Sequence, residues 1–383
     1  MPRDVVTNPI PGSAAFRATG DAAILSQAAI LLMIGRQLRS DDQSLRARAL
    51  AFTGQEPASE EEPDFPIPRL RPAAMRIRRT DAGKGLRERY GSTLLRTPTG
   101  EGPTQQFGDR LADITERLYA DPDPVIAAQL MEGALRHPDE LVRVAAAASY
   151  FPISAEPQRL VRILRHAVES VDELTHLVAV TTLARVEPEN AKLRKLTRSK
   201  PPRRGGTPSH TSLIVHGTFA ANDSWWAPGG EFHTYLKAQV RPDLYSANDR
   251  FGWSGGYSDS ARAIAAGQLT NWVSARNLAG LDLFTHSHGG SVAMLATQAG
   301  LVVGELIMLS CPVHVPEYFP DFTKVTKKAV SIRVHLDLVI LADFGGQRFH
   351  DPRITEHLLP IWFDHSATHY PSVWQANNIP AML

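Results

Sequence analysis

The stretch LDLFTHSHGG, residues 281–290, joins a run of apolar and alternating residues to a pair of glycines. The residues before Ser287 predict a buried strand, and GGSVAMLATQA (289–299) predicts a helix. A serine at such a strand-to-helix turn is either a nucleophile held on a strained backbone or a cap of the following helix. The rest of the sequence bears on the choice between these two interpretations.

Strands and helices alternate on both sides of this turn. Further strands are predicted at 212–218, at 303–311, at 329–337, at 357–365 and at the end of 243–253. The intervening helices are predicted at 230–240, 258–277 and 371–379. Alternating buried strands and helices indicate an α/β fold, a doubly wound and mostly parallel sheet with helices on both faces.

Polar residues follow several of these strands. They are His216-Gly217-Thr218 after the first, Ser287-His288 after the central one, and Asp337 and Asp364-His365 after the last two. In open α/β sheets, sites form at the carboxyl ends of the strands. Along the chain, the nucleophile and its partners would then run in the order Ser287, Asp337, His365.

Residues 207–383 resemble the α/β-hydrolase superfamily, near its compact bacterial lipases and esterases. THSHGG (285–290) resembles the nucleophile elbow G-x-S-x-G, with Thr285 in the place of the first glycine. HGTF (216–219) is similar to the loop that supplies oxyanion-hole amides, and FGWSGGYSDSAR (251–262) resembles the W-S-G stretch of lipase-like enzymes. HSATHYPSVW (365–374) resembles the loop that carries the catalytic histidine.

This resemblance implies a serine hydrolase that cleaves carboxylic esters through an acyl-enzyme. Ser287 would be the nucleophile, His365 its general base, and Asp337 the acid that orients the imidazole. The amides of Thr218 and His288 would bind the oxyanion. His369 is the alternative base and Asp343 the alternative acid.

Four aromatic residues flank the strand ends, and they either line an acyl pocket or belong to the core: Trp225, Trp226, Trp253 and Tyr257. The histidines lack zinc-site spacing and no Gly-Lys-Ser/Thr loop is present, so no metal or cofactor is predicted. Two other functions stay open. One is a non-catalytic interaction or scaffold protein with a degenerate hydrolase fold, and the other is an amidase or acyltransferase that uses the same triad.

The first half of the chain has a helical period of three to four residues from 105 to 197. Its helices are separated by Asp- or Glu-Pro segments, and DELVRVAAAASYF (139–151) resembles the first helix of a HEAT-like repeat. A plain helical bundle is the alternative. We therefore predict N-terminal helices and a Pro- and charge-rich linker at 1–104, an all-helical domain at 105–197, a hinge at 198–210 and the catalytic domain at 211–383.

Composition indicates an ordinary globular protein. Its 41 Lys and Arg residues against 40 Asp and Glu residues give a net charge of +1 and no attraction to nucleic acid, and the basic stretch 69–89 is offset by nearby acids. The apolar run 22–35 is too short to span a bilayer and predicts a buried helix, with Ser40 capping the next one. We expect a cytoplasmic protein without an integral membrane segment. Its expected partners are a small-molecule or lipid ester and, through the helical domain, a protein.

Overall fold

The computed structural model describes residues 10, 12–38, 103–154, 156–197, 211–278 and 280–383. The predicted Ser40 cap, the basic stretch 69–89 and the predicted hinge 198–210 lie outside the described residues. The chain divides into two compact units, Met1–Val186 with Leu341–Phe344, and Glu187–Ile340 with Gly345–Leu383.

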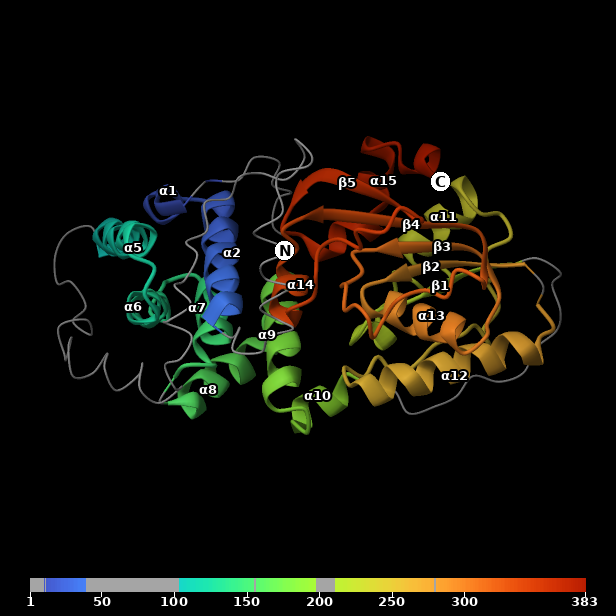
Figure 1. Cartoon of the computed structure of the whole chain (residues 1–383), viewed down its shortest axis with the longest axis horizontal. Coiled ribbons are helices and arrows are strands. Elements are labelled where there is room, and N and C mark those ends of the chain that lie inside the picture. The colour runs from blue at the N-terminus through green and yellow to red at the C-terminus, as the bar shows by residue number, and fades with distance from the viewer. Residues whose placement is uncertain (1–9, 11, 39–102, 155, 198–210, 279) are drawn as a thin grey trace. The chain divides into compact units, whose positions relative to one another are not determined.

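The second unit is an α/β structure built on a five-stranded, all-parallel sheet (Figure 1). The strands lie side by side in chain order: β1 (Thr211–Val215), β2 (Leu281–His286), β3 (Val303–Leu309), β4 (Val325–His335) and β5 (Ile354–Trp362). All five strands were expected from the sequence. The strand predicted at the end of 243–253 is reduced to one parallel bridge between Leu244 and Ser212. The coarse α/β prediction is thus confirmed.

Helices cover both faces of this sheet (Figure 1). The helices α12 (Asp259–Ala275) and α13 (His288–Gln298) supply one buried cluster, in which Leu269 and Trp272 pack with Leu283 of β2. On the other face, α11 (Glu231–Gln239) and α15 (Pro371–Ala376) pack around Phe284 of β2. Successive strand residues point to opposite faces, so the neighbours Leu283 and Phe284 of β2 each serve one of the two clusters.

The two glycines after Ser287 let α13 start directly against the neighbouring strands. A Cβ at Gly289 would lie 2.3 Å from the carbonyl oxygen of Val215 at the end of β1. A Cβ at Gly290 would lie 2.3 Å from Cys311 Sγ, just after β3. Both positions therefore require glycine for close packing, which is why the pair stands at the strand-to-helix turn.

Gly289→Ala is expected to destabilise the second unit strongly, because its methyl group would meet backbone atoms that cannot rotate away. Overpacking of this kind costs about 1–3 kcal/mol or more of unfolding free energy. Gly267→Ala is the matched control: Gly267 lies within α12 with nothing within 4 Å of an added Cβ. There the alanine should stabilise by about 0.5–1 kcal/mol. Urea unfolding measures both, and equal effects of the two variants would contradict the packing described here.

The first unit is all-helical in the residues described. Its helices are α1 (Gly12–Arg17), α2 (Asp21–Leu38), α5 (Pro103–Ala120), α6 (Pro124–Ala134), α7 (Glu140–Tyr150), α8 (Pro157–Ala167) and α9 (Glu173–Val186). The breaks expected from the sequence set the helix starts. Asp123 and Asp139 cap α6 and α7 with their side chains, and Pro157 opens α8. A HEAT-like arrangement of these helices stays a prediction.

The unit boundaries differ from the predicted ones. The helices α1 and α2 belong with α5–α9 rather than to a separate N-terminal segment: Arg17 of α1 bonds Glu116 of α5 at 2.8 Å. Gly35 of α2 lies against Ser149 of α7. The second unit starts at Glu187, so the helix α10 (Ala191–Lys195) belongs to it and not to the helical domain. An apolar helix such as α2 needs cover on several sides, and no pattern in the sequence names the covering helix.

Among the described helices, α2 is long and apolar enough to cross a membrane by length and composition. Within the structure, 67% of its 18-residue window is buried. This burial is that of a core helix, as the sequence predicted for 22–35. The expected location in the cell stays a prediction.

Candidate active site

Ser287 lies on a strained turn between β2 and α13. Its backbone has φ 53° and ψ −135°, a conformation that L residues rarely adopt. The Ser287 N–H donates to the carbonyl oxygen of Leu309 at 2.9 Å, which ties the turn to the end of β3. Thr285, which stands where the elbow pattern has glycine, donates its Oγ1–H to Ile307 O at 3.1 Å. The threonine is thus satisfied by the neighbouring strand and does not prevent the turn.

Residues with positive φ recur at the carboxyl edge of the sheet. Each of the five strands is followed, within four residues of its end, by a non-glycine residue with positive φ: Phe219, Ser287, Ser310, Leu336 and Phe363. Such residues cost roughly 1–3 kcal/mol each and persist only where the surroundings impose them, which is common at functional sites. The strain therefore marks the carboxyl edge of the sheet, where the predicted residues lie, as the candidate site.

Asp337 and His365 meet at the ends of β4 and β5. His365 Nδ1 lies 2.8 Å from Asp337 Oδ2, and both side chains are buried, 3% and 1% exposed. A carboxylate only accepts hydrogen bonds, so Nδ1 is the protonated nitrogen and Nε2 of the neutral ring is the basic one. The other carboxylate oxygen, Oδ1, accepts from the amides of Val339 and Ile340 at 3.0 and 3.1 Å. These amides open the helix α14 (Leu338–Asp343), so the acid is held rigidly.

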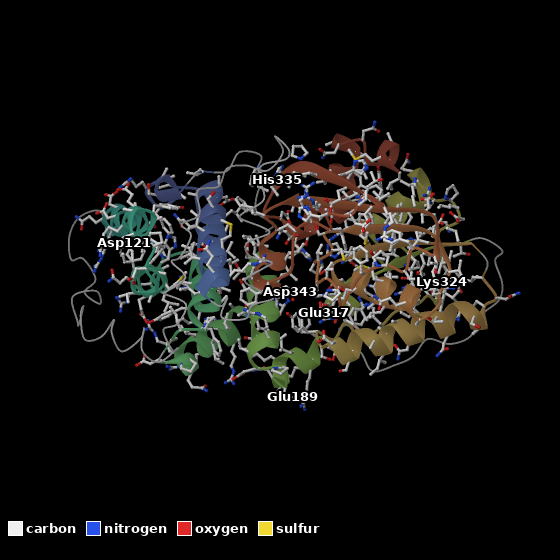
Figure 2. All side chains as sticks on the ribbon, viewed as in Figure 1. Asp121, Glu189, Glu317, Lys324, His335 and Asp343 are labelled. Atoms are coloured by element: carbon white, nitrogen blue, oxygen red, sulfur yellow. The ribbon has the colours of Figure 1, made fainter. Side chains whose placement is uncertain are left out.

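A ring stack and a backbone hydrogen bond join the ends of β4 and β5, which precede Asp337 and His365. His335, the last residue of β4 (labelled in Figure 2), stacks on Trp362, the last residue of β5, with ring centroids 4.2 Å apart. The amide of Phe363 donates to His335 O at 2.8 Å. Burial, with a smaller effect from the charge of Arg333, lowers the pKa of His335 to about 4. The neutral ring can therefore stack on the indole at neutral pH.

The loop proposed for the oxyanion hole touches the turn that carries Ser287. A Cβ at Gly217 would lie 2.8 Å from Ser287 Cβ, so the loop after β1 packs directly on the serine. The Phe219 N–H donates to Gly255 O at 2.9 Å, which fixes the loop next to Thr218. His288 is the first residue of α13, where backbone N–H groups point out of the helix end. The structure thus brings the loop that contains Thr218 against the Ser287 turn, and His288 directly follows Ser287 in the chain.

The four aromatic residues divide into two kinds. Trp226 and Trp253 are each 3% exposed, pack on the ring of His216, and donate their indole N–H groups to backbone carbonyls at 2.8 Å. They support the loop after β1, and this role differs from the pocket lining that was predicted for them. The sequence does not distinguish a tryptophan that is buried from one that lines a pocket. Trp225 and Tyr257 are half-buried, and Tyr257 meets the His288 ring edge-on at 5.7 Å. These two remain candidates for substrate contact.

His369, the alternative base, is the last residue of the short 3-10 helix η4 (His365–His369), and the ring that bonds Asp337 is that of His365. His369 stacks on Trp225, with ring centroids 4.1 Å apart, and is 6% exposed. Burial first, and then the charge of His365, lowers the pKa of His369 to about 3. Likewise, the carboxylate that bonds His365 is that of Asp337, while Asp343 stands at the far end of α14.

His369→Phe is expected to flatten the acid side of the stability profile. Between pH 6.5 and about 3 the unfolded chain binds a proton that folded His369 does not, so unfolding free energy falls as pH falls through this window. Phenylalanine keeps an aromatic ring to stack on Trp225 and removes the imidazole that binds this proton in the unfolded chain. The slope should decrease by up to about 1.4 kcal/mol per pH unit. Chemical denaturation from pH 7 to 4 measures this slope, and an unchanged slope in His369→Phe would contradict the prediction.

Two residues that hold this part of the structure were not among the site residues predicted from the sequence. Gln347 accepts from the Asp337 amide at 3.2 Å through Oε1. His286, adjacent to Ser287, is 3.2 Å from the carbonyl oxygen of His365 through Nε2. The sequence contains no signal for Gln347. For His286, the position at the strand end was visible, but its partner lies on a distant part of the chain.

His288, which directly follows Ser287, and His314 stack with ring centroids 5.9 Å apart, and imidazole nitrogens are common metal ligands.

No family model and no curated protein matches this chain. Its resemblance to solved structures is weak, as two examples show. An uncharacterized protein from Bacillus cereus ATCC 10987 has 13% identity and a TM-score of 0.27, over 71% of this chain and 96% of that one. A structure described as AbyA5 wild type has 14% identity and a TM-score of 0.26, over 72% of this chain and 84% of that one. Likenesses of this size do not bear on function.

Proposed function

We propose that the second unit is a serine hydrolase that cleaves carboxylic esters through an acyl-enzyme. The observation that carries the proposal is the strained Ser287 turn at the sheet edge where His365 and Asp337 form a buried pair. The nucleophile, the orienting acid and the base follow one another along the chain in the order of the family that the sequence resembles. A serine that only capped the helix would require neither the strained Ser287 backbone nor the Asp337–His365 pair. The Ser287 side chain also makes no capping hydrogen bond.

The chemistry follows from the protonation of His365. Its Nε2 takes the proton of Ser287 Oγ as the oxygen attacks the ester carbonyl carbon, and Asp337 stabilises the imidazolium. The carbonyl oxygen becomes an oxyanion between the amides of Thr218 and His288. When the C–O bond breaks, Nε2 returns the proton to the leaving alcohol. Water, deprotonated by the same nitrogen, then releases the carboxylic acid and restores Ser287.

A fluorophosphonate probe on the full chain tests this function. The serine hydroxyl displaces fluoride from phosphorus, so peptide mass spectrometry should find the adduct on Ser287. Hydrolysis of p-nitrophenyl esters of increasing chain length should accompany labelling and stop once the adduct has formed. A chain that neither reacts with the probe nor hydrolyses any ester of the series, or an adduct on another residue alone, would contradict the proposal.

A further inference from the structure

The loop that carries His365 is held to the sheet edge by a side chain next to the nucleophile. His286, the last residue of β2, is buried and its Nε2 lies 3.2 Å from the carbonyl oxygen of His365. A carbonyl only accepts, so Nε2 of His286 carries the proton and donates. Because side chains two apart in a strand share a face, His286 points to the same face as Phe284, where Ala367 of η4 packs.

We propose that His286 is a positioning residue for the reaction, which holds the backbone of His365 so that its imidazole keeps one orientation toward Ser287. This inference rests on the proposed hydrolase function. His365 is then anchored twice: Asp337 holds its ring at Nδ1 and His286 holds its carbonyl. With its backbone carbonyl and its Nδ1 both held, the imidazole of His365 presents only Nε2 to a substrate. Displacements of about 1 Å at such a group cost roughly 10²-fold in rate.

The surroundings of His286 keep it a neutral donor. Its ring meets those of His365 and His369 at 4.8 and 4.7 Å, and that of Trp225 at 5.4 Å. Burial, followed by the charges of His369 and His365 and, more weakly, that of His216, sets the pKa of His286 well below its ordinary value. All three of these histidines would repel a charged His286 ring. His286 therefore keeps its role throughout the neutral pH range.

The loop has a second tether that supplies a matched control. Thr368 Oγ1 lies 3.1 Å from Ser310 Oγ at the end of β3, and Trp374 donates its indole N–H to Thr368 O at 2.7 Å. Thr368→Val removes the bond to Ser310 and leaves both anchors of His365 intact. A loss that came only from loosening η4 would appear in this variant as well.

The experiment compares His286→Phe, His286→Gln and Thr368→Val in the full chain. The phenylalanine variant keeps the ring volume without the donor, and kcat for a p-nitrophenyl ester should fall roughly 30–100-fold with KM nearly unchanged. The glutamine variant retains an N–H donor of similar reach and should recover most of the rate, and Thr368→Val should stay within about threefold of wild type. Should His286→Phe fail to fold, His286→Asn takes its place, because the asparagine amide is too short to reach the carbonyl oxygen of His365.

A second measurement is independent of activity. The proton of the His365 Nδ1 to Asp337 bond should give a downfield resonance that is sharp in the wild-type and glutamine proteins and broadened in the phenylalanine variant. Equal losses in His286→Phe and Thr368→Val, or no recovery with glutamine, would overturn the positioning role. A wild-type chain with the sharp resonance but no esterase activity and no reaction with the fluorophosphonate would instead remove the proposed function.

Discussion

Ser287→Ala is expected to abolish ester hydrolysis, with kcat falling on the order of 10⁶-fold. Without Oγ no acyl-enzyme can form, and only the oxyanion amides and substrate binding remain. The fold should survive, because alanine meets the same positive φ that serine already tolerates and the side chain makes no cap bond. Kinetics with p-nitrophenyl esters and fluorophosphonate labelling measure the loss, and thermal unfolding checks the fold.

The control for this prediction is Ser274→Ala, which changes an exposed serine of α12 and should keep full labelling and activity. Labelling that persists in a folded Ser287→Ala protein would show that the probe reacts elsewhere. The nucleophile proposed here would then be incorrect.

Asp337→Asn should lower kcat about 10⁴-fold, because it changes which ring nitrogen of His365 carries the proton. The amides of Val339 and Ile340 require an oxygen at the Oδ1 position, so the new side-chain NH₂ group must face His365 Nδ1. Nδ1 then has to accept, and the ring proton moves to Nε2. A protonated Nε2 cannot take the proton of Ser287, although all the atoms keep their places.

Asp343→Asn is the matched variant, with the same chemical change at the other acid predicted from the sequence. It should keep most of the activity, since the carboxylate that bonds His365 is that of Asp337. Steady-state kinetics across the ester series compare the two. A larger loss in Asp343→Asn than in Asp337→Asn would reassign the acid.

Much of the second unit was readable from local patterns. Five strands and the helices between them follow from runs of apolar residues bounded by turns, since strand and helix periods are properties of neighbouring residues. In the first unit, the helix starts at Pro124, Glu140 and Pro157 follow from capping and proline chemistry in the same way. Ser287, Asp337 and His365 could be predicted as candidates because each lies within three residues of a strand end, and parallel strands end at one edge of the sheet.

Contacts between distant segments could not be read in this manner. Whether His365 or His369 faces Asp337 depends on how η4 folds over the sheet edge, and both histidines look alike along the chain. Trp226 and Trp253 resemble pocket residues in sequence, yet hydrogen bonds of their indoles place them beneath the loop after β1. The partner of α2 was equally hidden, because an apolar surface does not specify which apolar surface covers it.

The sequence by itself therefore determined the elements, their order and the residues at the strand ends, all of which depend on interactions over a few residues. The tertiary structure alone decided the Asp337–His365 bond, the left-handed backbone after each strand and the bond from His286 to His365. These features join residues far apart in the chain. They form only when the sheet brings its strand ends together, since hydrogen bonds and close packing act over a few ångströms of space regardless of sequence separation.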